Sequence, residues 1–209
     1  MPTFKDFYFN SSTGKNKIHA RMCVPDAEPR AIVQIIHGIA EYIDRYDEFM
    51  SFLADNGIIA VGTDHLGHGK SIESDEQTGF FAYDNGWDYV VRDEEVLRLA
   101  MHENYPELPI IVFGHSMGSF LARAFVTKHG RNLTAAIFCG TSGGMAGIPA
   151  LLTLVDSLKI LHGDKYRSNA VNKLAFGAYT RKITDKVSEY DWISRDPEIV
   201  STYEKDPKC

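Results

Sequence analysis

Short apolar runs alternate with longer amphipathic stretches along the first two thirds of the chain. Strand-like runs are predicted at Phe4–Asn10 and Lys17–Val24. The turn sequence Ser11-Ser12-Thr13-Gly14 joins them, which predicts an antiparallel hairpin. Four more runs, each short enough for a strand and apolar enough to be buried, are Ala31–Ile36, Ile58–Val61, Ile110–Phe113 and Leu133–Cys139.

Helices are predicted between these runs. A helix is predicted after Ala31–Ile36, because apolar residues recur there at helical spacing, at Tyr46, Phe49, Met50 and Leu53. Asn56-Gly57 is a typical end for this helix. A second helix is predicted over Trp87–Asn104, and a third runs from Gly118 to His129-Gly130. Apolar strands that alternate with helices predict an α/β fold with a mostly parallel, doubly wound sheet behind the leading hairpin. Right-handed crossovers would place helices on both faces.

The pattern changes at Gly143. The Gly-rich segment Gly143-Gly144-Met145-Ala146-Gly147 is interpreted as a flexible joint. Helices are predicted near Ala150–Leu161 and Ser168–Tyr179, followed by a loop over Asp191–Pro197, with no further buried strand. This division predicts two parts, an α/β core over 1–142 and a helical cap over 143–209.

The stretch Ile110–Gly118 carries the clearest chemical signal. Four apolar residues lead into Gly114-His115-Ser116-Met117-Gly118, and a helical pattern follows directly. A buried strand, a tight Gly-x-Ser-x-Gly turn and a helix are the sequence form of a nucleophile elbow. Gly114 and Gly118 would let the strand and helix backbones approach closely, and Ser116 would sit in a strained conformation. Ser116 is therefore the predicted nucleophile.

Other polar residues follow the predicted strands. His37-Gly38, Asp64 and Thr141-Ser142 each come at the carboxyl end of a run, as Ser116 does. In open α/β sheets the carboxyl ends of the strands are where ligands bind. The positions of these residues therefore support a site at that edge, independently of the serine motif.

Composition narrows the function classes. The net charge of −6 and the absence of a basic stripe argue against nucleic-acid binding. The start of the chain lacks the apolar core of a signal peptide, no run could span a bilayer, and the three cysteines form no disulfide framework, so a cytoplasmic protein is predicted. Asp64-x-x-Gly67-His68-Gly69 lacks a third ligand at metal spacing and is interpreted as a structural turn. No metal and no cofactor are expected.

The motifs together resemble the α/β-hydrolase superfamily, and within it the monoacylglycerol lipase and lysophospholipase group, also called serine aminopeptidase S33-like hydrolases. The resemblance covers nearly the whole chain. One departure is Tyr42, where that group often has a second histidine. The matching runs are His37-Gly38-Ile39-Ala40-Glu41 with Arg45-Tyr46, Asp64-His65-Leu66-Gly67-His68-Gly69-Lys70-Ser71, Gly114-His115-Ser116-Met117-Gly118, Ser194-Arg195-Asp196-Pro197 and Asp206-Pro207-Lys208-Cys209.

The resemblance implies roles for these residues. Ser116 would attack an ester carbonyl, and the backbone N–H groups of Ile39 and Met117 would form the oxyanion hole. Glu41 and Arg45, spaced i,i+4 on a predicted helix start, would form an ordinary ion pair or brace the oxyanion loop. The residues expected to shape the site are His37, Gly38, Glu41, Gly114, His115 and Gly118.

The sequence offers no convincing catalytic histidine. Ser116 is followed by His129 and His162 alone. His129 ends the elbow helix, about 20 Å along it at 1.5 Å per residue, and His162 follows no strand. In the family pattern two later strands carry the acid and the histidine. Ala135–Cys139 would also become an outer strand with an apolar, unpaired edge, which natural sheets avoid. These features predict that the 209 residues are the amino-terminal part of a longer hydrolase, inactive alone.

Three functions remain open at this stage. The first is a serine esterase or lipase acting on monoacylglycerols, lysophospholipids or similar esters, with transient membrane-surface contact through the cap. The apolar side chains of the cap would either line an acyl pocket or pack against the core. They belong to Leu151, Leu152, Leu154, Val155, Leu158 and Ile160. The second is an S33-type peptidase, and the third is a catalytically inactive hydrolase-fold protein.

Overall fold

The computed structural model describes residues 1–144 and 147–209. The chain divides into two compact units, Met1–Ser142 with Lys208, and Gly143–Pro207 with Cys209. Two residues of the predicted joint, 145 and 146, lie outside the described residues.

The first unit is built on a six-stranded sheet with strand order β1-β2-β4-β3-β5-β6. Strands β3 to β6 run parallel to one another, while β1 pairs antiparallel with β2, and β2 pairs antiparallel with β4. The sheet is therefore mixed, with the predicted hairpin at one edge and the parallel strands beyond it. The strands are β1 Thr3–Asn10, β2 Lys17–Val24, β3 Ala31–Ile36, β4 Ile58–Thr63, β5 Ile110–His115 and β6 Ala135–Cys139.

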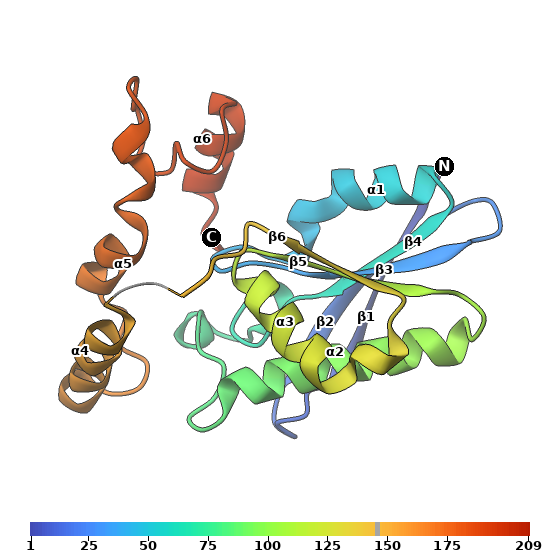
Figure 1. Ribbon diagram of the computed structural model, residues 1–209, viewed down its shortest axis with the longest axis horizontal. Coiled ribbons are helices and arrows are strands. Elements are labelled where there is room, and N and C mark those ends of the chain that lie inside the picture. Colours follow the sequence, from blue (N-terminus) through green and yellow to red (C-terminus); the bar gives the residue numbers. More distant parts are fainter. Residues whose placement is uncertain (145–146) are drawn as a thin grey trace. The chain divides into compact units, whose positions relative to one another are not determined.

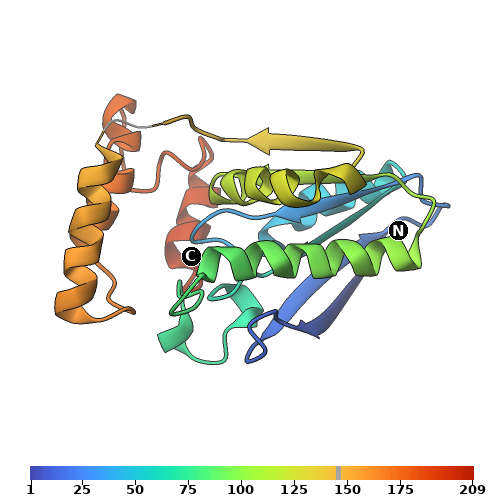
Figure 2. The same ribbon diagram turned by 60° about the horizontal axis from the view of Figure 1, so that its bottom comes forward.

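Helices cover both faces of this sheet (Figures 1 and 2). Helix α1 lies on one face, and α2 and α3 lie side by side on the other, which confirms the doubly wound arrangement. The three α-helices are α1 Asp47–Asp55, α2 Gly86–Asn104 and α3 Met117–His129. Short 3-10 turns occur at η1 Ile43–Tyr46, η2 Gly69–Ser71, η3 Asp75–Gln77 and η4 Gly130–Asn132.

The alternation of side chains along β3 divides the core between the two faces. Val33 and Ile35 pack in one cluster with Met50 and Leu53 of α1. Neighbouring positions point the other way: Ile32 shares a cluster with Leu97 of α2, and Ile36 shares one with Leu121 and Phe125 of α3. Gln34 belongs to the second set, so its amide is buried on the α2 side of the sheet.

Strand β6 forms the edge of the sheet, as the sequence predicted. In the described part of the chain it pairs with β5 alone. Ile137 and Phe138 are 49% and 39% exposed. The strand begins at Ala135 rather than Leu133, because η4 precedes it.

The second unit is helical. Its elements are α4 Ile148–His162, α5 Asn169–Phe176, η5 Tyr179–Lys182 and α6 Pro197–Lys205. Helix α5 is shorter than predicted, and α6 follows the predicted Asp191–Pro197 loop without having been predicted itself. Asp196 caps α6 by accepting a hydrogen bond from the amide of Glu198 at 2.9 Å, and Pro197 is its first residue. Among the described residues, no helix combines the length and apolarity that crossing a bilayer requires.

Candidate active site

Ser116 occupies a strained turn between β5 and α3. Its φ of 52° and ψ of −120° lie outside the regions that a residue with a side chain normally adopts. Its amide donates to the Cys139 carbonyl at 3.0 Å, and its carbonyl accepts from the Ser119 amide at 2.9 Å and the Ser119 hydroxyl at 2.6 Å. The turn is therefore fixed on both sides, with the Ser116 side chain left half-buried at the carboxyl end of the sheet.

Two glycines allow the strand and the helix to meet at this turn. A Cβ on Gly114 would lie 2.4 Å from the Gly118 carbonyl oxygen. A Cβ on Gly118 would lie 1.9 Å from the carbonyl oxygen of Ile36 and 2.4 Å from that of His37. All three distances are shorter than van der Waals contact, so these positions require glycine.

The turn that follows β3 lies next to Ser116. A Cβ added to Gly38 would come within 3.1 Å of the Ser116 Cβ, which places the His37–Gly38 peptide beside the serine. Ala40, in the same turn, has a φ of 53°. Within residues 1–144 and 147–209, no group accepts a hydrogen bond from the backbone N–H of Ile39 or of Met117.

Glu41 braces this turn. One of its carboxylate oxygens, Oε1, accepts from the Gly38 amide and from the Tyr46 hydroxyl at 2.8 Å, and it lies 3.2 Å from Nδ1 of His115. The expectation that Glu41 begins a helix was wrong, since the helical turn starts at Ile43. Sequence reasoning also missed the Tyr46 hydroxyl, because Tyr46 falls on the apolar face of the predicted helix.

The Glu41–His115 contact changes the pKa of both groups. Burial of Glu41 tends to raise the pKa of its carboxyl, but the hydrogen bonds from His115 and the Gly38 amide outweigh burial and lower it. The same hydrogen bond raises the pKa of His115. His115 therefore pairs with the carboxylate beside the His37–Gly38 turn.

Three further histidines lie buried behind the turn: His37, His65 and His68. The rings of His37 and His65 stack with their centroids 3.8 Å apart. Burial, with a further contribution from the neighbouring His65, lowers the pKa of His37 well below its usual value and that of His68 to about 4. His37 and His68 are therefore neutral at physiological pH, which suits the loop-shaping role predicted for them.

The histidines considered as bases are engaged elsewhere. His129 lies 3.5 Å from Glu95, and its ring packs on Phe125. His162, in the second unit, stacks on Tyr166 with ring centroids 4.2 Å apart. In the described part of the chain, no histidine forms a hydrogen bond with the Ser116 hydroxyl.

The Asp64 loop has a structural role. The buried carboxylate of Asp64 accepts from the amides of Ile43 and Lys70, each at 2.7 Å, and from Nδ1 of His19 at 2.8 Å.

One group of side chains has metal-ligand spacing. Asp6, His19 and Asp44 offer ligand atoms within 4.8 Å of one another. Lys70 pairs with Asp44 at 2.8 Å, and Arg21 pairs with Asp6 at 2.9 Å, so cationic side chains already neutralise the carboxylates.

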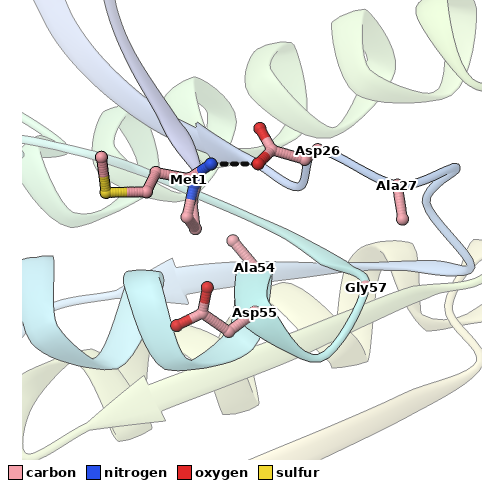
Figure 3. Close-up of a pocket in the computed structure, with 7 residues that line it drawn as sticks. Met1, Asp26, Ala27, Ala54, Asp55 and Gly57 are labelled. Atoms are coloured by element: carbon pink, nitrogen blue, oxygen red, sulfur yellow. Dashed lines mark hydrogen bonds and ion pairs between the residues drawn. The ribbon is translucent and has the colours of Figure 1, made fainter.

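A small pocket of about 260 Å³ lies where the chain enters β3 and β4 (Figure 3). The amino group of Met1 pairs with Asp26 at its rim. Ala27 and Gly57, which also line it, precede β3 and β4, whereas Ser116 follows β5. The pocket is therefore separate from the candidate active site.

Fold and site together define an α/β hydrolase: a mixed, mostly parallel sheet flanked by helices, with a strained serine between the fifth strand and its helix. The solved structure of a highly thermostable carboxyl esterase from Bacillus coagulans is 34% identical and superposes with a TM-score of 0.88 over 99% of this chain and 66% of that chain. A lipase in its open form is 31% identical with a TM-score of 0.82, over 99% of this chain and 67% of that one.

Sequence comparison gives the family. The family described as serine aminopeptidase, S33 matches residues 27–209, and the chain belongs to it. A monoacylglycerol lipase from Mycolicibacterium smegmatis is 28% identical over 184 residues, which are 88% of this chain and 58% of that protein. The chain thus spans less than two thirds of that lipase's length.

Proposed function

We propose that Ser116 is the nucleophile of a serine hydrolase that cleaves carboxylic esters. The observation that carries this proposal is the conformation of Ser116, which combines a φ of 52° with a position at the first turn of α3 and beside Gly38. A serine held this way exposes its hydroxyl at the top of the sheet. Backbone strain of this kind is typical of functional sites.

The chemistry follows from the neighbouring amides. As a general base takes its proton, the Ser116 oxygen attacks the ester carbonyl, and the carbonyl oxygen becomes an oxyanion that accepts hydrogen bonds from the amides of Ile39 and Met117. Collapse of this intermediate breaks the bond to the alcohol, which leaves with the proton from the base. The acyl group stays on Ser116 until water hydrolyses it to the carboxylic acid and restores the serine hydroxyl. Losing one oxyanion donor typically costs about two to three orders of magnitude in rate.

The reaction also needs a base and an acid that orients it. The chain spans 58% of the mycobacterial lipase, and His129 and His162 are engaged away from Ser116. We propose that the base and the acid belong to the part of the relatives' length that this sequence does not span. Without a base, a serine hydrolase loses on the order of a millionfold in kcat, so these residues alone would be a poor catalyst.

The proposed substrates are esters of single acyl chains, such as monoacylglycerols and lysophospholipids. Support comes from the names of the relatives, a monoacylglycerol lipase and a carboxyl esterase. Helix α4 adds a second argument, because none of its residues is buried although it is rich in apolar side chains. Such a surface suits an acyl chain and transient contact with a membrane surface. The residues that would form it are Leu151, Leu152, Leu154, Val155, Leu158 and Ile160.

The test compares two substrate classes in the longest natural form of the protein. Hydrolysis of p-nitrophenyl esters of varied chain length is expected, with kcat reduced roughly a millionfold in Ser116→Ala. The exposed Ser74 provides a matched control, and Ser74→Ala should hydrolyse esters at the wild-type rate. Hydrolysis of aminoacyl anilides in preference to esters would favour the peptidase, and activity that survives Ser116→Ala would contradict the proposal.

A further inference from the structure

A line of buried polar side chains leads from helix α2 to the turn beside Ser116. Glu94 in α2, His65 behind β4 and His37 at the end of β3 are each 2% exposed or less. Buried ionisable groups are costly unless they are paired and hydrogen-bonded. The hydrogen-bond partners of these three side chains therefore indicate their structural role.

Glu94 ties two strands to α2. Its Oε1 accepts from the Thr63 hydroxyl at 2.6 Å, and its Oε2 accepts from the Gln34 side-chain amide at 2.6 Å. The same amide also donates to the Glu94 carbonyl at 2.9 Å. Oε1 lies 3.3 Å from Nδ1 of His65. Glu94 is thus in contact with the residues that end β4 and with the middle of β3.

Hydrogen bonds assign the proton positions on the two histidines. The main-chain amide of His65 donates to Nε2 of His37 at 3.1 Å, so this nitrogen is an acceptor and Nδ1 of His37 carries the proton. That Nδ1 donates to the Gly38 carbonyl at 2.7 Å. Nε2 of His65 lies 3.1 Å from the His37 carbonyl oxygen, which can only accept, so Nε2 of His65 is protonated.

The second nitrogen of His65 then faces a carboxylate. The Thr63 hydroxyl, which donates to Oε1 of Glu94, lies 3.4 Å from the same Nδ1. Glu94 therefore contacts the His65 ring both directly and through Thr63. The other rings beside His65 are those of His37, with centroids 3.8 Å apart, and His68, with centroids 6.1 Å apart.

We propose that Glu94 is a positioning residue for the oxyanion hole, which it orients by holding the His65 ring in place, directly and through Thr63. His65 contacts His37 twice, at its ring and at its carbonyl oxygen. The His37 ring in turn fixes the Gly38 carbonyl. Because the peptide that joins Gly38 to Ile39 is planar and trans, fixing its carbonyl also fixes the direction of the Ile39 N–H. The inference rests on the oxyanion role proposed for Ile39.

The peptide between His37 and Gly38 is held at both ends. Its carbonyl, from His37, accepts from His65, and its amide, from Gly38, donates to Glu41. Glu41 therefore holds the turn from the side of His115, and Glu94 holds it through His65 from the side of α2. A rigid, pre-oriented donor is what oxyanion stabilisation requires.

The ring contacts are tested by nuclear magnetic resonance of this chain with ¹⁵N-labelled histidine. The hydrogen bonds require a proton on Nε2 of His65 and on Nδ1 of His37, and none on Nε2 of His37. A proton on Nε2 of His37, or an unprotonated Nε2 of His65, would overturn the proposal. This measurement needs neither a variant nor activity, so it remains decisive if a variant does not fold or if the proposed function fails.

The Glu94→Gln variant tests the positioning effect. It should shift the ring ¹⁵N resonances of His65 and the Ile39 amide resonance. The matched control is Glu103→Gln, an exposed position on the same helix that should change neither signal. In the longest natural form, Glu94→Gln should lower kcat about 10-fold with KM unchanged, as expected for a misaligned oxyanion donor. An Ile39 amide and a kcat that do not respond to Glu94→Gln would contradict the proposal.

Discussion

Backbone strain concentrates at the two loops that form the candidate site. Among the described residues, the non-glycine residues with positive φ are Ala40, Asn85 and Ser116. Ala40 lies in the turn behind β3, and Ser116 lies in the turn behind β5. Each such residue costs of order 1–3 kcal/mol and persists because its surroundings hold it in place.

Gly118 is the residue whose replacement should disturb these loops most. In Gly118→Ala the new methyl group would lie 1.9 Å from the Ile36 carbonyl oxygen, so β3 and α3 must move apart. We expect the free energy of unfolding to fall by about 3 kcal/mol, as measured by urea denaturation. A Cβ added to Gly144 would meet no atom within 4 Å, so Gly144→Ala should change the free energy of unfolding by less than about 0.5 kcal/mol. Equal stability of the two variants would contradict the close approach.

The His115–Glu41 pair makes a pH-dependent prediction. Because the hydrogen bond to Glu41 raises the pKa of His115, Glu41→Gln should lower that pKa toward about 6.5 in an NMR titration. A raised folded-state pKa stabilises the fold below the unfolded-state pKa, and this stabilisation is lost as pH rises through the folded-state pKa. The stability difference between wild type and Glu41→Gln should therefore shrink above that pH. Glu48→Gln, at an exposed position, is the control, and an unshifted His115 in Glu41→Gln would be inconsistent with the pair.

At the residue scale, the sequence identified part of the site. The Gly-x-Ser-x-Gly pattern predicted Ser116 and its turn, because local sterics dictate both the glycines and the strain. Glu94 and Gln34 were missed, although each interrupts an apolar pattern: Glu94 falls on the buried face of α2, and Gln34 lies inside β3. A single polar residue in such a pattern does not reveal its partner, because that partner comes from a distant element.

At the element scale, the side chain of His19 links the amino-terminal hairpin to the loop behind β4, in addition to the backbone pairing of β2 with β4. Nδ1 of this buried ring faces Asp64 and Nε2 faces Asp6, each at 2.8 Å, so a proton on both nitrogens satisfies both carboxylates. Burial tends to lower the pKa of His19, but the hydrogen bonds to Asp64 and Asp6 outweigh burial. The pKa of His19 is therefore raised. The protonated ring therefore links β1 and β2 to the loop behind β4.

Replacing His19 should weaken the fold in a pH-dependent way. His19 stabilises the fold fully below its unfolded-state pKa, and this contribution is lost as pH rises through the raised folded-state pKa. We expect His19→Gln to lower the free energy of unfolding by about 3 kcal/mol at pH 6 and by less at pH 9. Urea denaturation at the two pH values measures this, with His102→Gln at an exposed position of α2 as the control. An equal loss at both pH values would show that His19 does not act through its charge.

Most elements could be predicted because hydrophobic periodicity is local. The strands of the first unit and α1 to α3 begin and end within a few residues of the prediction. Helix α6 was missed, although Asp196-Pro197 is a typical helix start and Val200 and Tyr203 are buried along one side. Nearby turn residues had favoured a loop. The strand order, in contrast, depends on crossovers that periodicity does not encode.

At the scale of the whole molecule, the sheet has an apolar edge. Strand β6 is the last in the strand order, and its Ile137 and Phe138 are exposed. A flat, apolar edge strand is a template for pairing with another chain.

Self-association of this chain should therefore depend on β6. Sedimentation under reducing conditions should detect concentration-dependent association, which Ile137→Lys weakens by about 10-fold or more, because charged residues on an edge oppose pairing. Ile199, on α6, is 47% exposed, close to the 49% of Ile137, so Ile199→Lys is a matched control and should not weaken it. A chain that stays monomeric at all concentrations, or an equal effect of both variants, would contradict the prediction.

In the proposed site, a strained turn presents the hydroxyl of Ser116 to the amides of Ile39 and Met117. The decisive test is labelling of the longest natural form with a fluorophosphonate probe, followed by mass spectrometry of its peptides. We expect a covalent phosphonate on Ser116 that is abolished by Ser116→Ala and retained in Ser74→Ala. A protein that folds but is not labelled, or is labelled at another residue, would contradict it.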